Sequence, residues 1–162
     1  MLVKLQEMKK TDICICGEIH SRAFSRTSYT LETTANDHEL RNETNERHNN
    51  DALYLSSFID DYDKYAFCIV VDNTIVGYIT AILFPSWNTI KVVFIDSFAI
   101  EPSMQRKGVG SEALKQFINV FPEGTAMQLM TTKDRPAYAF YQKLGFLDMA
   151  DLGDYGLRLL IR

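Results

Sequence analysis

The sequence predicts one α/β domain with a central mixed sheet, and three observations carry this prediction. Runs of β-branched and aromatic residues, which are typical of strands, alternate with segments whose apolar residues recur at helical spacing. Two of these runs, 66–71 and 74–84, are joined by Asp72 and Asn73, a tight-turn pair that indicates a hairpin. A strand, a helix and another strand follow one another between residues 90 and 131, which implies a parallel pair.

The N-terminal elements follow from alternation and capping. Residues 2–5 alternate enough for an edge strand, and Thr11 or Asp12 can cap the helix that follows. The apolar face of that helix consists of Ile13, Cys16, Ile19 and Ala23. Residues 25–50 are polar and carry no apolar stripe, although 37–48 contain good helix formers, so we expect a mobile flap there rather than core.

A helix and a strand flank the hairpin in the middle of the chain. Asp51 can cap the helix, and Pro85 ends the second hairpin strand before a further strand at 90–100. The buried face of the helix consists of Leu55, Phe58 and Ile59. Regular alternation in the strand places on one face Phe94, Asp96, Phe98 and Ile100. Asp96 therefore interrupts an otherwise apolar face.

The C-terminal half supplies two more helices and three strands. Residues 108–121 form a helix with an apolar face, and Pro136 is tolerated in the first turn of a last helix that begins at Asp134 or its neighbour. Gly145 is well placed as the C-cap of that helix. The remaining elements are a turn at 122–124, a strand at 126–131, and closing strands at 147–150 and 155–161.

Length and composition bound the class of protein. The 162 residues, 46% of them apolar, suffice for one domain that buries a core without disulfides or metal. The longest apolar run, 74–84, is too short for a membrane helix, and the N-terminus lacks the apolar core of a signal peptide. We therefore expect a cytoplasmic protein with no membrane partner.

The cysteines and histidines show no metal-ligand spacing, so we predict no metal site. They are Cys14, Cys16, Cys68, His20, His38 and His48. We interpret the cysteines, which are odd in number and lie in apolar surroundings, as buried reduced thiols, and we assign no histidine a role.

A loop at 105–110 separates the strand at 90–100 from the helix that follows. Gly108 and Gly110 leave no Cβ over the backbone, so the amides that open the helix can point at an anion, which the helix dipole favours. Arg106 and Lys107 add positive charge beside them. The loop is typical of a site for a phosphate-bearing cofactor.

Two known phosphate loops fit it less well than a third. A Walker loop places its lysine after the glycines, whereas Lys107 precedes them. Residues 108–113 match the dinucleotide fingerprint G-x-G-x-x-A, with Asp134 further on, but 101–107 intervene between the strand and the first glycine of that fingerprint. An NAD-type site therefore stays a runner-up.

The third use rests on two blocks in order. The pattern Gln105-x-x-Gly108-x-Gly110 after a strand, followed by the block 137–146, resembles the acetyl-CoA site of the GNAT superfamily of N-acetyltransferases. This resemblance implies one N-acetyltransferase domain over 1–162. It also implies a mostly antiparallel mixed sheet of six to seven strands, with a splayed parallel pair and about four flanking helices.

The activity implied by the resemblance is transfer of an acetyl group from acetyl-CoA, without a metal. The acceptor would be a primary amine of a small molecule or peptide, which attacks directly in a ternary complex. The alternative from another class is a silent acyl-CoA-binding sensor or partner-binding module. Family precedent allows a homodimer.

The resemblance also implies which residues hold the cofactor. The pantetheine arm would lie on the backbone of Phe98, Ala99 and Ile100. The diphosphate would lie on the loop and helix start, namely Gln105, Arg106, Lys107, Gly108, Val109, Gly110 and Ser111. Asp134, Ala137 and Tyr141 complete the set, although the family often has asparagine in place of Asp134.

Two residues are predicted to move protons. The resemblance places Tyr141 where a tyrosine protonates the coenzyme A thiolate, while a core aromatic is the other interpretation. Asp96 is the candidate base for the acceptor amine; a satisfied structural carboxylate or a solvent-facing one are its alternatives. Trp87 and Tyr29 could line the acceptor pocket or serve only in packing.

Charge is distributed unevenly along the chain. The net charge of −4 argues against general affinity for nucleic acid. Residues 32–64 hold nine acids and three bases, which gives −6, and the rest of the chain is at +2. We hypothesise that a cationic acceptor and a phosphate-bearing cofactor prefer opposite ends of the molecule; a solvated acidic surface explains the pattern equally well.

Overall fold

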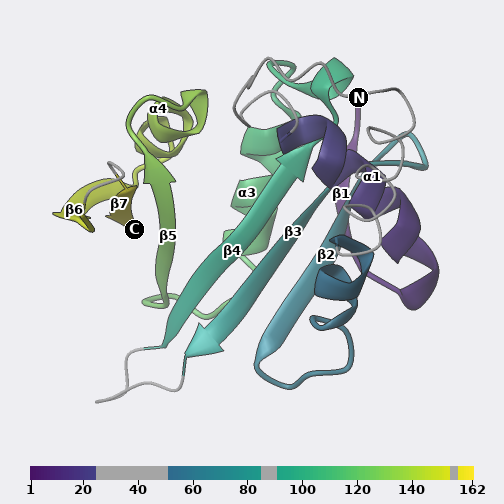
Figure 1. Cartoon of the computed structure of the whole chain (residues 1–162), viewed down its shortest axis with the longest axis horizontal. Coiled ribbons are helices and arrows are strands. Elements are labelled where there is room, and N and C mark those ends of the chain that lie inside the picture. Colours follow the sequence, from purple (N-terminus) through teal and green to yellow (C-terminus); the bar gives the residue numbers. More distant parts are fainter. Residues whose placement is uncertain (25–50, 85–90, 154–156) are drawn as a thin grey trace, which may run out of the picture.

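The computed structural model describes residues 1–24, 51–84, 91–153 and 157–162. Its centre is a seven-stranded mixed sheet with strand order β1-β2-β3-β4-β5-β7-β6 (Figure 1). The strands are β1 Val3–Glu7, β2 Lys64–Val71, β3 Thr74–Phe84, β4 Val92–Ile100, β5 Ala126–Thr132, β6 Leu147–Asp151 and β7 Leu157–Ile161. The helices are α1 Ile13–Phe24, α3 Val109–Ile118 and α4 Pro136–Lys143, together with a helical segment at 51–56. The predicted α/β class and mixed sheet are confirmed.

The predicted hairpin is confirmed as β2 and β3. Asp72 and Asn73 form its turn with φ angles of 48° and 65°, the left-handed conformation that favours Asx residues in tight hairpin turns. The C-cap of α4 is Leu144, and Gly145, the predicted C-cap, is the next residue; it has a φ of 89° and donates its N–H to the carbonyl of Gln142.

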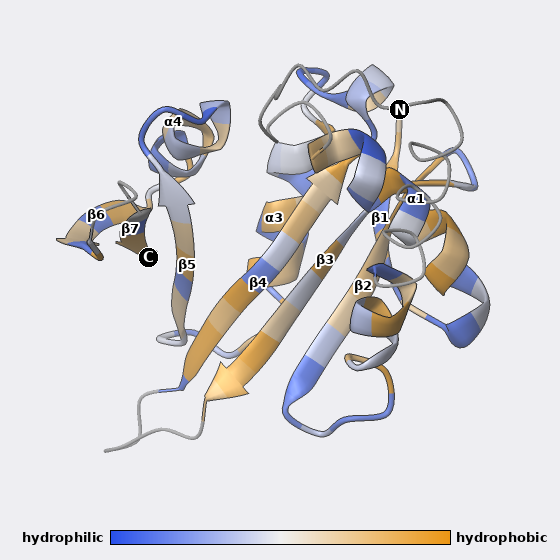
Figure 2. Cartoon of the chain, viewed as in Figure 1, coloured by the Kyte–Doolittle hydropathy of each residue, from blue (hydrophilic) through white to orange (hydrophobic). Residues whose placement is uncertain are grey.

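Helices cover both faces of the sheet. On one face, α3 and α4 pack against β3, β4 and β5 through a core that includes Leu114, Phe117, Met127 and Tyr141. On the other face, α1 and the segment 51–56 pack against β2 and β3. Apolar residues run along β2, β3 and β4 (Figure 2), which accounts for burial of these strands on both sides.

The parallel pair of strands is short. β4 and β5 pair only at Val92–Ala126, Val93–Met127 and Phe94–Gln128, after which β5 pairs with β7 alone. Beyond Phe94, β4 and β5 diverge (Figure 1), so β4 has one open edge among the described strands. The predicted parallel, splayed pair is confirmed.

The predicted alternation along β4 is wrong, because the strand contains a β-bulge. Thr80 pairs with Ser97 and Ala81 with Ile95, so Asp96 is the extra residue without a partner on β3. Ile95 and Phe98 consequently face α3 and α4, whereas Phe94 lies on the opposite face. A bulge shifts the period of two by one residue, and nothing local in the sequence marks it.

The cysteine prediction is partly wrong. Cys14 is exposed, whereas Cys16 and Cys68 are buried with their Sγ atoms 3.7 Å apart.

The expected flap at 25–50, with Tyr29, and the connection with Trp87 lie outside the described residues. In the part of the chain that the structure describes, no helix is long and apolar enough to cross a membrane. No three acidic, histidine or cysteine side chains gather as a metal site within that part.

Removing the Thr80 hydroxyl is expected to stabilise the fold. Thr80 is fully buried on β3, and within the described residues its Oγ1 has no hydrogen-bond partner, so the hydroxyl is desolvated without compensation. Thr80→Val should raise the free energy of unfolding by about 1 kcal/mol in urea denaturation. Ser97→Ala, which removes a hydroxyl that has a partner, should lower it; equal effects of the two changes would contradict this account.

Candidate functional site

The N-terminus of α3 is open. Gly108 is its N-cap with a φ of 83°, no side chain caps the helix, and the first intrahelical bond recorded there runs from the N–H of Glu112 to the Gly108 carbonyl. The amides of residues 109–111 therefore have no acceptor within the helix. A Cβ built on Gly108 would meet no atom within 4 Å, so the space beside the N-cap itself is open.

The loop before α3 is fastened to the end of β4. Gln105 donates from Nε2 to the Ile100 carbonyl at 2.9 Å. Arg106 adopts a φ of 61° and is exposed, as is Lys107. The two cationic side chains therefore stand at the surface beside the open helix end, where an anion is favoured.

The end of β4, the start of α3 and α4 converge. A Cβ on Gly110 would lie 3.6 Å from the Phe140 ring of α4 and 3.7 Å from Ile100. The rings of Phe98 and Phe140 lie 6.0 Å apart. Sequence-distant residues predicted to hold one cofactor therefore come from three neighbouring elements.

The open edge of β4 presents backbone groups of two residues. The N–H of Glu101 bonds to the Val76 carbonyl, so odd-numbered residues near the end of β4 direct their backbone toward β3. Phe98 and Ile100 consequently direct theirs toward the open edge, where Gln105 takes the Ile100 carbonyl. Of the three residues predicted to line the arm, Ala99 therefore turns its backbone to β3.

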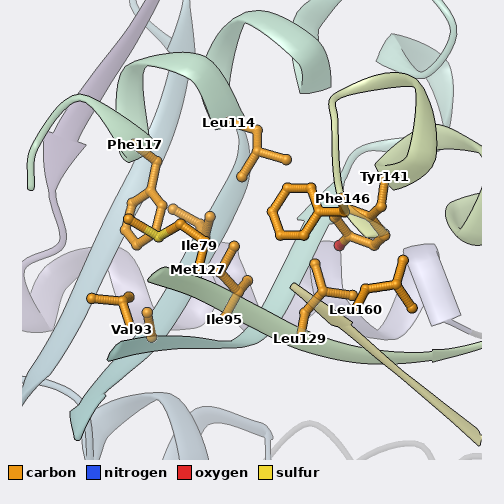
Figure 3. Packing of buried hydrophobic residues seen from close by; sticks show 11 residues of the cluster. Ile79, Val93, Ile95, Leu114, Phe117, Met127, Leu129, Tyr141, Phe146 and Leu160 are labelled. Atoms are coloured by element: carbon orange, nitrogen blue, oxygen red, sulfur yellow. The ribbon is translucent and has the colours of Figure 1, made fainter. Parts of the chain in front are cut away.

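Tyr141 lies in the core under this edge. Its ring packs against that of Phe146 (Figure 3), with ring centroids 5.5 Å apart. The ring of Phe140 lies 5.1 Å away. Burial raises the pKa of the phenol well above its usual value, so the hydroxyl keeps its proton at neutral pH. Among the described residues its hydroxyl has no hydrogen-bond partner. Ala137 is half-buried on the same helix, and Asp134 is exposed just before it.

Asp96 stands out at the bulge of β4. It is exposed, and no cation or donor contacts it within the described ranges. Partial burial by neighbouring residues of the protein raises the pKa of its carboxyl. The described residues therefore do not support the interpretation of Asp96 as a carboxylate satisfied by a structural partner.

A chain of polar side chains that the sequence did not reveal runs through the face covered by α1. Tyr78 on β3 is fully buried, and its hydroxyl is hydrogen-bonded to Nδ1 of His20 on α1 and, at 2.8 Å, to Oγ of Ser97. Nε2 of His20 lies 3.9 Å from Oδ1 of Asp51, and the other carboxylate oxygen of Asp51, Oδ2, accepts a 2.9 Å hydrogen bond from the Ser21 hydroxyl. No spacing could indicate this contact, because 58 residues separate its two central members.

The sequence profile described as "Acetyltransferase (GNAT) family" matches residues 28–146, which is more than half of the chain. The chain belongs to this acetyltransferase family. A search of curated proteins found no match to this acetyltransferase.

Solved structures of the family share the fold of this acetyltransferase. An acetyltransferase from Thermus thermophilus has a TM-score of 0.75 and 19% identity, with 100% of this chain and 97% of that chain covered. The PaiA N-acetyltransferase of Thermoplasma acidophilum, solved with coenzyme A, has a TM-score of 0.71 and 14% identity, covering 100% and 99%. Arabidopsis thaliana Naa50, solved with the bisubstrate analogue CoA-Ac-MVNAL, has a TM-score of 0.69 and 14% identity, again covering 100% and 99%.

His20 is expected to make the stability of this acetyltransferase depend on pH. Burial lowers its pKa, against an opposing effect of Asp51, so the folded protein disfavours the imidazolium. Its contribution is complete above the unfolded-state pKa near 6.5 and is lost as the pH falls through the folded-state value. In urea denaturation at pH 7 and pH 5, His20→Gln should lose less stability on acidification than the wild type, and an equal loss would contradict this.

Proposed function

We propose that this acetyltransferase moves the acetyl group of acetyl-CoA to the primary amine of a small molecule or peptide, within one domain over 1–162. The observation that carries the proposal is the open N-terminus of α3 beside the open edge of β4. One element offers uncapped amides for a diphosphate, and the other offers unpaired backbone for an amide-containing arm. The proposed setting is the cytoplasm, and no metal takes part.

The residues around this junction fit acetyl-CoA. The amides of 109–111 would hold the diphosphate, with Arg106 and Lys107 as mobile counter-charges. The backbone of Phe98 and Ile100 would hold the pantetheine arm along β4. When bound, acetyl-CoA supplies an acetyl group activated as a thioester.

Tyr141 is proposed as the proton donor to the departing sulfur. Burial keeps the phenol protonated, and the side chain lies beside Phe140, whose ring approaches Phe98 on the open strand. A neutral donor with a free hydroxyl can give its proton to a thiolate as the carbon–sulfur bond breaks. The same burial would also suit a core aromatic in a catalytically silent acyl-CoA-binding module, and the variants below separate the two.

Asp96 is proposed to deprotonate the acceptor. An alkyl ammonium, with a pKa of about 10.4, must lose a proton before its nitrogen can attack. The exposed carboxylate at the bulge would attract that ammonium and take its proton to solvent. The −6 charge over 32–64 would further favour a cationic acceptor. A peptide amine is included because the Arabidopsis neighbour was solved with a peptide-bearing analogue.

Gly108→Ala should weaken acetyl-CoA binding at least tenfold. At a φ of 83° an L-side chain costs about 1 kcal/mol, so the loop is expected to shift and misplace the helix amides. Gly124→Ala is the matched control, because Gly124 has a φ of 84° and equal space but lies beyond the other end of α3. Affinity for acetyl-CoA is measured by calorimetric titration, and an equal loss of affinity in both variants would contradict the proposed site. Wild-type protein that binds NAD rather than acetyl-CoA would contradict it as well.

Tyr141→Phe should lower kcat about a hundredfold while the dissociation constant of acetyl-CoA stays unchanged, because only the proton donor is lost. Tyr138→Phe is the control on the same helix, since the Tyr138 hydroxyl donates instead to Asp148 at 2.7 Å. Thiol release is measured for both. Equal rates in Tyr141→Phe and the wild type would favour the silent module or another donor.

A screen for thiol release tests the function itself. Polyamines, aminoglycosides, amino acids and peptide N-termini are offered with acetyl-CoA. Cationic acceptors should give the highest kcat/KM because of the acidic segment. Preference for neutral or acidic acceptors would contradict the charge argument, and tight acetyl-CoA binding without any acetylation would contradict the enzyme.

A further inference from the structure

The hydrogen-bonded side chains of His20, Tyr78 and Ser97 reach β4 next to the bulge residue Asp96. Ser97 is the residue directly after the bulge and is half-buried, whereas Tyr78 is fully buried. The His20 side chain, at the other end, is 26% exposed. A line of hydrogen-bonded groups therefore connects the surface at α1 with the bulge, through the interior of the protein.

Ser97 lies on the face from which an acceptor would come. Helices α3 and α4 fill the face of β4 that carries Ile95 and Phe98. A thioester placed along the open edge is thus shielded on that side, and a nucleophile must approach from the side of α1. The Ser97 hydroxyl points to that side, because it bonds to the tyrosine that α1 covers.

Formation of an amide from an ammonium releases two protons from nitrogen. The first leaves before the attack, for which we have assigned Asp96. The second leaves as the carbon–nitrogen bond forms and the carbon–sulfur bond breaks, while the sulfur takes one proton from Tyr141. We propose, on the basis of the proposed function, that this second proton passes through Ser97 and Tyr78 to Nδ1 of His20.

The balance of this step is complete. Ser97 Oγ takes the proton from nitrogen and gives its own to the Tyr78 oxygen, which gives its own to His20. The imidazolium then releases a proton to solvent at its exposed end, and Tyr141 regains one from solvent. Acetyl-CoA and an ammonium thus yield an amide, a thiol and one free proton. Ser97 is the catalytic residue in this chain, and Tyr78 and His20 act through it as positioning residues.

His20 is suited to receive the proton. Burial lowers its pKa, so it is neutral at physiological pH, and a neutral ring can accept at Nδ1 if Nε2 carries the hydrogen. Asp51 at 3.9 Å would stabilise the imidazolium once formed. Among the residues that the structure describes, the other groups that face His20 or its partner are Ser21, which bonds to Asp51, the rings of Phe24 and Tyr54, and Cys16 near Tyr78.

Kinetics with two acceptor probes, spermidine and the pentapeptide Met-Val-Asn-Ala-Leu, test the relay. Ser97→Ala and Tyr78→Phe should each lower kcat about a hundredfold, and the double variant should lower it no further, because the chain acts as a unit. The KM for acetyl-CoA should not change. Values of kcat within threefold of the wild type in both single variants would overturn the proposal.

The pH profile separates a relay from a purely structural contact. Wild-type kcat should fall as the pH drops through the lowered pKa of His20, which burial places below the usual value of an imidazole, because protonated His20 can no longer accept. This acidic limb of the kcat profile should disappear in His20→Gln and Tyr78→Phe but persist in Asp96→Asn. Loss of thermal stability in these two relay variants with an unchanged limb would assign the chain to structure alone and overturn the relay.

Nitrogen NMR of the ligand-free protein gives a readout independent of activity. His20 should carry its hydrogen on Nε2, and Tyr78→Phe should remove this preference. Hydrogen on Nδ1 would mean that His20 donates to Tyr78, which excludes transfer toward the ring and overturns the proposal. Thr80→Val is the matched control, because Thr80 pairs with Ser97 across the sheet, but its hydroxyl has no hydrogen-bond partner among the described residues. This variant should retain the wild-type kcat and the acidic limb of the pH profile.

The outcomes also distinguish this proposal from the one on which it depends. Wild-type protein that binds acetyl-CoA and acetylates neither probe nor any amine in the screen would overturn the proposed function, and the relay with it. Wild-type turnover that the Ser97, Tyr78 and His20 variants leave unchanged would overturn the relay alone.

Discussion

The divergence of β4 from β5 is the constraint on which the rest of this acetyltransferase depends. The two strands share only three residue pairs, although both continue beyond them. A backbone group that loses its ladder partner costs about 1–3 kcal/mol wherever water cannot replace that partner. The large core formed by α3, α4 and the two strands offsets this cost and keeps the edge in place. The open edge is thus a stable feature of the ligand-free fold.

A single inserted residue then decides which side chains meet at that edge. The bulge at Asp96 reverses the alternation of β4, so that Ile95 and Phe98 both enter the core under α3 and α4. It leaves Asp96 exposed and turns Ser97 toward α1. Without the bulge, regular alternation would place Asp96 and Phe98 on the same face of the sheet, so a carboxylate would interrupt an apolar face.

The two faces of the sheet are held by different kinds of interaction. The face under α3 and α4 is held by a largely apolar core in which Tyr141 is a buried member. The face under α1 contains the hydrogen-bonded His20, Tyr78 and Ser97, and the buried thiols of Cys16 and Cys68. Buried polar groups in a protein interior require partners, so the hydrogen bonds of His20, Tyr78 and Ser97 orient α1 on the sheet, in addition to any part that they take in proton transfer.

The sequence by itself determined what depends on neighbouring residues: the hairpin turn at Asp72 and Asn73, the glycine that opens α3, the proline and glycine that bound α4, and the family. These follow from backbone preferences and spacing, which are local. Only the tertiary structure decided where β4 and β5 part, that Asp96 is a bulge, and that His20 meets Tyr78. Such features arise because pairing and packing bring distant segments together, and the free energy of those contacts is not written in any short stretch of the chain.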